Sequence, residues 1–169
     1  MSRNTELESL PIHPTPSDRR IPSTAPELRI TGLVAQPLTA TPADLSVLAR
    51  IDLADDFACE EGWSVPGVRW QGVQLADVLA LARIDPSARF VRVGSGEYVV
   101  PVPLADAERA LLCDRLNGAP LPVEHGAPWR LVIPGGVCYT SVKWIDRLEV
   151  TAEAGANSGQ RIARARASG

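Results

Sequence analysis

Two short β-rich runs separated by a glycine-rich turn constrain the fold of this chain more than any other feature. Residues 89–93 and 97–102 are rich in valine, and Gly94-Ser95-Gly96 lies between them. Glycine adopts the backbone conformations that tight hairpin turns require, so this pattern predicts an antiparallel hairpin. Similar short runs, bounded by Gly or Pro, recur along the chain and predict further strands.

The remaining elements are predicted from periodicity and turn chemistry. Thr41-Pro42-Ala43-Asp44 is a typical helix start, because Thr can cap the first turn and Pro fits the first helical position. Turns are predicted at Pro66-Gly67 and over residues 70–73. The predicted strands cover residues 27–34, 49–58, 111–116, 130–133 and 144–151, and the predicted helices cover 42–48, 75–83 and a single turn at 104–107.

Length and composition favour one globular domain. The chain has 169 residues, of which 45% are hydrophobic and 22% charged, and its net charge of -3 gives no basic surface for nucleic acid. Proline and polar residues predict an extended arm over residues 1–26. The domain itself is expected over residues 27–151, and the Ala, Gly, Ser and Arg of residues 152–169 predict a disordered tail.

The three cysteines, Cys59, Cys113 and Cys138, have wide spacings and an odd count. This argues against a disulfide framework and a structural zinc site, and it fits a reducing compartment. Because no signal peptide and no apolar run of membrane-spanning length is present, the sequence predicts a cytoplasmic protein. Cys113 lies within an apolar strand pattern and is interpreted as a core residue.

Cys59 comes at the end of the predicted strand over residues 49–58 and opens a loop. A thiol at such a place can be reactive or can bind a metal. It can equally be a small buried hydrophobe, which is the usual fate of a cysteine without a disulfide. Position alone leaves both interpretations open.

Two segments together resemble a known family. The first is Cys-Glu-Glu-Gly-Trp-Ser at residues 59–64, and the second is Asn-Gly-x-Pro-Leu-Pro-x-x-His-Gly-x-Pro-x-Arg-Leu at residues 117–131. Over roughly residues 28–150 the chain resembles the molybdopterin-binding domain of the sulfite oxidase family. The resemblance implies an α+β fold, mostly β, with short helices packed around a mixed sheet.

The resemblance also implies a cofactor, molybdenum-molybdopterin, and roles for particular residues. The family's metal ligand corresponds to Cys59. The residues that contact the pterin or bind its phosphate correspond to His125, Arg130, Ser141, Val142 and Lys143. Two alternatives stay open on spacing alone: an ordinary loop with a solvated Lys143, and a His125 that caps a carbonyl.

Further residues have implied or ambiguous roles near this site. In the methionine-sulfoxide-reducing branch of the family an acidic residue matching Glu61 faces the metal, although a solvated charge beside Glu60 is the plainer interpretation. Trp63 and Trp70 would line the site or cover the core edge. Cys138 stands where relatives usually carry Gly, so its side chain would crowd or line the site.

The function implied is a molybdenum-dependent oxidoreductase that transfers an oxygen atom. Sulfite oxidases of animals and plants carry Arg five residues past the cysteine, where this chain has Ser64. Reduction of an S- or N-oxide is therefore favoured over sulfite oxidation. The expected partners are a small-molecule substrate and an electron-transfer protein, without nucleic acid or a membrane span. The alternative is a non-catalytic module that binds a ligand or a protein through the same fold.

Overall fold

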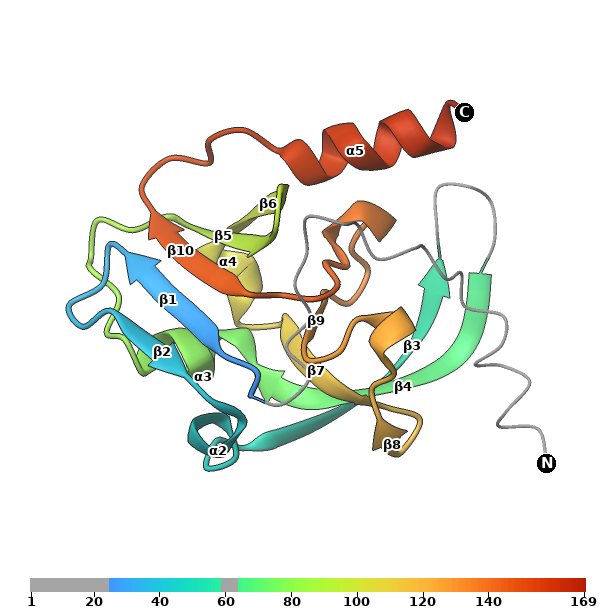
Figure 1. Ribbon diagram of the computed structural model, residues 1–169, viewed down its shortest axis with the longest axis horizontal. Coiled ribbons are helices and arrows are strands. Elements are labelled where there is room, and N and C mark those ends of the chain that lie inside the picture. The colour runs from blue at the N-terminus through green and yellow to red at the C-terminus, as the bar shows by residue number, and fades with distance from the viewer. Residues whose placement is uncertain (1–24, 59–63) are drawn as a thin grey trace.

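The computed structural model describes residues 25–58 and 64–169, and two β-sheets form its framework (Figure 1). The first sheet has five strands in the order β2-β1-β10-β5-β6, and the second contains β3-β4-β7-β8 with β9 also paired to β7. The strands of the first sheet are β1 (Leu28–Gly32), β2 (Leu38–Ala40), β5 (Phe90–Ser95), β6 (Tyr98–Pro103) and β10 (Arg147–Thr151). Those of the second are β3 (Arg50–Ala58), β4 (Ser64–Gln74), β7 (Leu111–Leu116), β8 (Ala119–Pro120) and β9 (Arg130–Val132).

The first sheet is mixed, as predicted. β1 and β10 are parallel, whereas the β1–β2, β10–β5 and β5–β6 pairs are antiparallel. The glycine-rich hairpin is confirmed: Ser95 pairs with Tyr98, and Gly96 in the turn has a φ of 56°. Positive φ is the conformation for which glycine carries no steric penalty.

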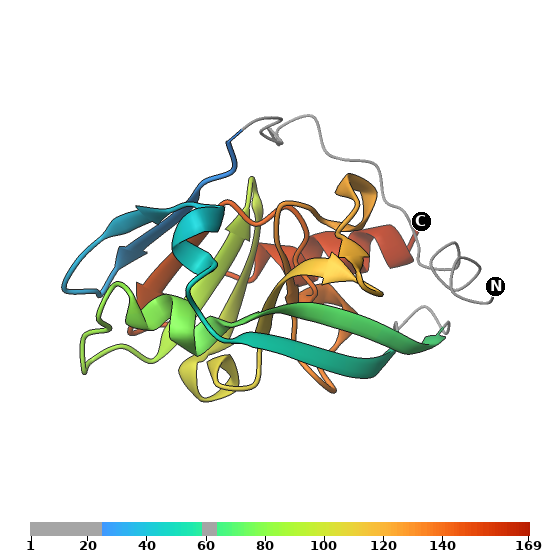
Figure 2. The same ribbon diagram turned by 90° about the horizontal axis from the view of Figure 1, so that it is seen from below.

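The second sheet is antiparallel, and its long β3–β4 pair extends away from the first sheet (Figure 2). Side chains alternate between the two faces of a strand. On β7, Leu112 therefore packs into the core shared with the first sheet. Its neighbours Leu111 and Cys113 join a second, smaller cluster with Trp70 on the opposite face. The candidate site is built on that opposite face.

Short helices fill the spaces between strands, and the fold is α+β, as predicted. The predicted cap of α2 (Pro42–Leu45) is confirmed, since Thr41 and Asp44 form reciprocal capping hydrogen bonds. Apolar residues on one face of α3 (Leu75–Ala80) are buried in the larger core. The other short helices are α4 (Leu104–Ala107) and the 3-10 turns η1 (Val123–His125) and η2 (Cys138–Thr140).

The two turns predicted near Trp70 are not chain reversals. β4 runs unbroken from Ser64 to Gln74, and each glycine-containing segment forms a register irregularity instead. Gly67, with a φ of 68°, lies where β4 shifts against β3, and Gly72 lies where it shifts against β7. Pairing with strands on both sides outweighs the local turn preference of these residues.

The predicted disorder of residues 152–169 is also wrong. Helix α5 (Ser158–Ala167) occupies most of this segment and packs against β6 and η2. Ala, Arg and Gln are good helix formers, and Asn157 caps the first turn by accepting a hydrogen bond from the Gln160 N–H. The expected arm over residues 1–26 lies almost wholly outside the described residues. No helix in the described ranges is long and apolar enough to cross a membrane.

Gly72 should be essential for the contact between β4 and β7. A Cβ atom at this position would lie 2.7 Å from the Cα atom of Cys113 and closer still to the Leu112 carbonyl oxygen. We expect Gly72→Ala to lower the free energy of unfolding by about 2 kcal/mol or more, measured by urea denaturation. Gly118→Ala is the matched control, because a Cβ there meets nothing within 4 Å and only the positive φ is strained. Its cost should be about 1 kcal/mol, and equal costs for the two variants would contradict the prediction.

Candidate functional site

Arg130, at the start of β9, is a buried cation on the smaller apolar face of the second sheet. Its backbone pairs with Cys113 of β7, and the residue is only 4% exposed. The guanidinium carbon lies 4.8 Å from the centre of the Trp70 ring. This contact is favourable because the face of an aromatic ring carries negative charge.

Hydrogen bonds fix the Arg130 guanidinium between two loops. Nε donates to Ser141 Oγ at 2.9 Å, and one terminal nitrogen donates to the His125 carbonyl oxygen at 3.0 Å. Ser141 Oγ in turn donates to the Leu131 carbonyl oxygen at 3.1 Å. The Ser141 hydroxyl therefore orients Arg130 from one side, while η1 orients it from the other.

Lys143 brings a second cation to the same loops. Its Nζ donates to the Glu124 carbonyl oxygen at 3.1 Å and lies 5.6 Å from the centre of the Trp144 ring. The Trp144 indole N–H donates to the Val123 carbonyl oxygen at 2.7 Å. η1 and the segment around residue 143 are thus tied together by side-chain to backbone hydrogen bonds.

Gly126 permits this close approach. It has a φ of 122°, and a Cβ atom there would lie 3.1 Å from the Cβ atoms of both Arg130 and Lys143. Glycine meets both requirements of this position, because it adopts a positive φ without a steric penalty and has no side chain to contact Arg130 and Lys143. The His-Gly pair in the sequence motif therefore has a structural reason.

Burial dominates the electrostatics of the two cations. Burial first, and then the nearby Arg130 charge, lower the pKa of Lys143 from an ordinary value of 10.5 to about 7. Burial also lowers the pKa of Arg130 to about 10, so Arg130 stays protonated at neutral pH. An anion placed between them would favour the charged form of Lys143.

His125 presents a buried nitrogen with an unused hydrogen-bonding capacity. The residue is 4% exposed, and its Nδ1 atom has no hydrogen-bond partner in the described structure. Burial lowers the pKa of His125, and the charges of Lys143 and Arg130 lower it further, so the ring is neutral near pH 7. A neutral imidazole can donate from one nitrogen and accept at the other, which suits a heterocyclic ligand with both kinds of group.

The loop before Lys143 uses its own backbone amides. The N–H groups of Ser141 and Val142 donate to the carbonyl oxygens of Cys138 and Thr140. Val142 is buried, and its carbonyl oxygen accepts from the Leu131 N–H at 2.9 Å. These two amides are therefore already used within the loop, and Val142 contributes by holding the loop against β9.

The structure brings together all five predicted cofactor-binding residues, His125, Arg130, Ser141, Val142 and Lys143, whereas Cys59, Glu61 and Trp63 lie outside the described residues. The ends of the strands on either side of that segment are adjacent, because Ala58 of β3 pairs with Ser64 of β4. The interpretation of Cys113 as a core residue is confirmed: it is fully buried, and burial raises its pKa to about 12.

Cys138 begins η2 and is partly buried. Its sulfur lies within electrostatic range of both Arg130 and Lys143. The sequence left open whether this side chain crowds or lines the site, and its electrostatic interaction with the two cations is what the structure adds.

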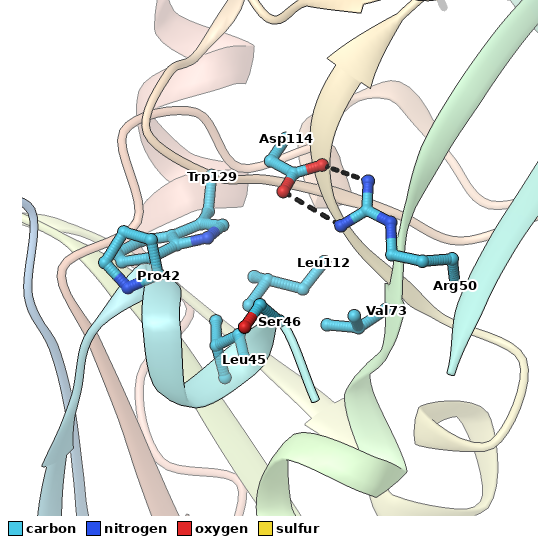
Figure 3. Close-up of a pocket in the computed structure, with 8 residues that line it drawn as sticks. All are labelled: Pro42, Leu45, Ser46, Arg50, Val73, Leu112, Asp114 and Trp129. Atoms are coloured by element: carbon cyan, nitrogen blue, oxygen red, sulfur yellow. Dashed lines mark hydrogen bonds and ion pairs between the residues drawn. The ribbon is translucent and has the colours of Figure 1, made fainter. Parts of the chain in front are cut away.

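A separate small pocket lies on the other face of the second sheet (Figure 3). Arg50 and Asp114, which both line it, form a two-pronged ion pair with distances of 3.0 and 2.6 Å. Trp129 lines this pocket, although the next residue, Arg130, belongs to the candidate site. Because the charges at this pocket are paired with each other, it is less suited to an ionic ligand than the Arg130 site.

Sequence reasoning missed Trp144 and the structural role of Gly126. Trp144 has a positive φ of 56°, lies beneath Lys143 and donates to η1. Trp144 directly follows Lys143 in the sequence, and this position could have indicated a role in the site. The sequence analysis instead assigned Trp144 to the final strand. In the parts of the chain that the structure describes, no three His, Cys, Asp or Glu side chains gather as a protein-only metal site would require.

The family is shown by a match over most of the chain. The family model described as "Oxidoreductase molybdopterin binding domain" matches residues 14–158. The chain therefore belongs to the sulfite oxidase-like family of molybdopterin-binding oxidoreductase domains.

Individual relatives agree with this assignment. The chain is 34% identical over 129 residues to "Uncharacterized oxidoreductase YuiH" of Bacillus subtilis, covering 75% of this chain and 65% of that protein. It is 29% identical over 136 residues to "Putative protein-methionine-sulfoxide reductase subunit YedZ1" of Azospira oryzae, covering 79% of this chain and 52% of that protein. Mitochondrial sulfite oxidase of Mus musculus is 36% identical over 111 residues, which cover 58% of this chain and 20% of that protein.

A solved structure supports the fold. The sulfane dehydrogenase SoxCD from Paracoccus pantotrophus superposes with a TM-score of 0.72 at 25% identity, covering 89% of this chain and 46% of that one. The chain thus spans only part of the length of these relatives, from 20% to 65%.

The charge on Lys143 should titrate near neutral pH and respond to an anion. Lys143 is the only lysine in the sequence, so carbon-13 labelling of lysine gives a single side-chain NMR signal. We expect a titration midpoint near 7 in protein free of phosphate, because burial and Arg130 lower the pKa. Inorganic phosphate should raise the midpoint by about one pH unit, because an adjacent negative charge favours the protonated amine.

Sodium chloride at equal ionic strength is the control for this titration. Arg130→Met should raise the midpoint without any anion, because it removes a neighbouring positive charge and keeps a buried side chain of similar size. A midpoint near 10.5 in the parent protein would show that Lys143 is solvated and would contradict the site's geometry.

Proposed function

We propose that this chain is an oxidoreductase that uses the molybdenum-molybdopterin cofactor, held between η1 and the loop over residues 135–143. The observation that carries this proposal is the convergence of three groups on one site. These are the buried guanidinium of Arg130, the partly buried amine of Lys143 and the unpartnered Nδ1 atom of His125. The family match supplies the cofactor class for which these groups are suited.

The donor set fits the chemical groups of such a cofactor. Arg130 and Lys143 suit a phosphate, because both cations can form charge-assisted hydrogen bonds to its oxygens. His125 Nδ1 suits a polar edge of a heterocycle. Ser141 keeps Arg130 oriented, so the guanidinium loses little conformational freedom when it binds. When bound, the molybdenum supplies two-electron oxygen-atom transfer, and the chain supplies binding and orientation.

Cys59 is proposed as the protein's ligand to the metal. A thiolate is a soft ligand that suits such a centre, and it binds only in its deprotonated form. Cys59 directly follows Ala58 in the sequence, and Ala58 at the end of β3 pairs with Ser64 of β4. Glu61, two residues after Cys59 in the sequence, is proposed to face the metal.

Mutation of Cys59 and mutation of Arg130 should affect cofactor content and turnover differently. Protein made in a host that synthesises molybdopterin should contain molybdenum and pterin near one per chain, measured by elemental analysis and by pterin fluorescence after release. Cys59→Ser should keep the pterin but reduce turnover to background, because a hydroxyl is a harder donor and stays protonated. Arg130→Met should lower pterin content, because the cofactor loses a charged hydrogen-bond donor.

Arg130→Met is preferred to an alanine variant, because replacing a buried charge with an apolar side chain of similar size preserves packing. Full activity in Cys59→Ser would overturn the role of Cys59. A parent protein that carries no molybdenum from a competent host would overturn the enzyme proposal and favour a non-catalytic binding module.

We propose an S- or N-oxide as the substrate rather than sulfite. Ser64 stands where sulfite-oxidising relatives have an Arg, and the chain is also similar to a putative methionine-sulfoxide reductase subunit. A missing charged hydrogen-bond partner costs about 1.5–3 kcal/mol, or roughly ten- to a hundredfold in affinity for an anion. Electrons would come from a partner protein, for which an artificial donor can substitute in assays.

Steady-state assays test this substrate choice. With a reduced dye as electron donor, reduction of a sulfoxide or N-oxide should be detectable, whereas sulfite oxidation should have a high KM. Ser64→Arg should lower the KM for sulfite by about tenfold, because it supplies the missing cation. Efficient sulfite oxidation by the parent at micromolar substrate would contradict the proposal.

A further inference from the structure

The turn η2 directly precedes Ser141 and Lys143 in the chain, so its position decides where these two site residues lie. The carbonyl oxygens of Val137, Cys138 and Thr140 accept hydrogen bonds from backbone amides within the loop. Hydrogen bonds of a 3-10 turn have poorer geometry than those of an α-helix, so they hold the chain less firmly. Contacts from outside the loop are therefore important for the position of η2.

Tyr98 on β6 provides such a contact. Its hydroxyl donates a hydrogen bond of 2.6 Å to the carbonyl oxygen of Tyr139, the middle residue of η2. Both tyrosines are partly buried and pack against the larger core. Because β6 belongs to the first sheet, this hydrogen bond ties the loop to the main framework of the fold.

Helix α5 holds Tyr98 in place and also packs against η2 (Figure 1). Ser158 Oγ accepts a hydrogen bond from the Val99 N–H at 2.9 Å and donates to the Glu97 carbonyl oxygen at 2.6 Å. Gly159 is buried, and a Cβ atom there would lie 2.7 Å from a ring carbon of Tyr98. The first turn of α5 is thus fixed on β6 and closely packed on the Tyr98 ring.

The position of η2 is transmitted to Arg130 by Ser141. The Ser141 hydroxyl accepts from Arg130 Nε at 2.9 Å and donates to the Leu131 carbonyl oxygen at 3.1 Å. Hydrogen bonds weaken steeply when their geometry departs from the ideal, so a displaced Ser141 would release one side of the guanidinium. Arg109 donates to the Pro134 carbonyl oxygen at 2.8 Å and holds the start of the loop. Tyr98 holds the part that adjoins Ser141.

A plainer role for the Tyr98 hydroxyl is to satisfy its own hydrogen bond and stabilise the fold. The two roles predict different results. A purely structural hydroxyl would change the free energy of unfolding and leave the orientation of Arg130 in the folded protein unchanged. A positioning hydroxyl would change the behaviour of the Arg130 side chain itself.

We propose that Tyr98 is a positioning residue for the Arg130 site. Through the Tyr139 carbonyl oxygen it fixes η2 and with it the Ser141 hydroxyl that orients the guanidinium, while α5 holds Tyr98 in place. The identity of the ligand as the phosphate of the cofactor rests on the proposed function. The positioning of Arg130 does not depend on that identity.

The test compares Tyr98→Phe with Tyr139→Phe in protein without cofactor. Tyr139→Phe is the matched control, because the link uses the backbone carbonyl oxygen of Tyr139 and not its hydroxyl. Nitrogen-15 labelling of arginine allows hydrogen exchange of the Arg130 Nε–H group to be followed by NMR, and the signal is identified by its loss in Arg130→Met. We expect Tyr98→Phe to speed this exchange roughly two- to tenfold, the factor that corresponds to the loss of one hydrogen bond.

Binding of inorganic phosphate, measured on the same proteins, should be weakened in Tyr98→Phe by a similar factor, because a less ordered guanidinium loses more freedom on binding. Tyr139→Phe should remain close to the parent in both measurements. A folded Tyr98→Phe variant that is less stable to urea but keeps the exchange rate and phosphate affinity of the parent would overturn the positioning role. If Tyr98→Phe does not fold, Ser158→Ala tests the same link, because it removes both hydrogen bonds of Ser158 to β6. Exchange at the parent's rate in that variant would then overturn the proposal.

Pterin content separates this proposal from the proposed function. In protein made in a host that synthesises molybdopterin, Tyr98→Phe should lose its pterin faster on dialysis than Tyr139→Phe. If the parent carries no pterin but Tyr98→Phe still speeds the exchange of Arg130, the proposed function fails and the positioning role stands. If the parent carries pterin and Tyr98→Phe exchanges like the parent, only the role of Tyr98 is overturned.

Discussion

The buried guanidinium of Arg130 is the interaction on which the site depends. Moving a charge out of water is costly, and the fold offsets that cost with hydrogen bonds to Ser141 and to the His125 carbonyl oxygen and with the face of Trp70. These partners come from three separate segments of the chain. Gly126 lets two of those segments meet, because any side chain at this position would press on Arg130. Much of the geometry of the site therefore follows from the burial of the Arg130 charge.

The burial of Lys143 near the positive charge of Arg130 destabilises the folded state. Between pH 7 and 10.5 the unfolded chain holds a proton on Lys143 that the folded chain releases, so this residue's destabilising effect decreases as pH rises through that window. Below about pH 7 the effect is fully present. A phosphate bound at the site would offset it, which couples ligand binding to stability. Such a conflict between stability and local charge is common at functional sites.

Local sequence signals succeeded where neighbouring residues alone decide the structure. The Gly94-Ser95-Gly96 turn and the Thr41–Asp44 cap are confirmed, because their hydrogen bonds close within a few residues. Prediction failed where distant partners decide. Residues 70–73 are a strand because β3 and β7 pair with them on both sides. Residues 158–167 form a helix whose position is decided by distant contacts, because the small residue Gly159 packs against Tyr98 and Val100 of β6.

The sequence by itself determined the family and the mostly β class, and it predicted five residues that lie together in the structure, because these are carried by local motifs and by contiguous patterns of residue type. Only the tertiary structure showed that Arg130 is buried on Trp70, that the amides of Ser141 and Val142 are already used, and that α5 packs against η2. These facts depend on contacts between residues far apart in the chain. Burial and electrostatics arise from the surroundings of a residue in space, and a linear pattern does not specify them.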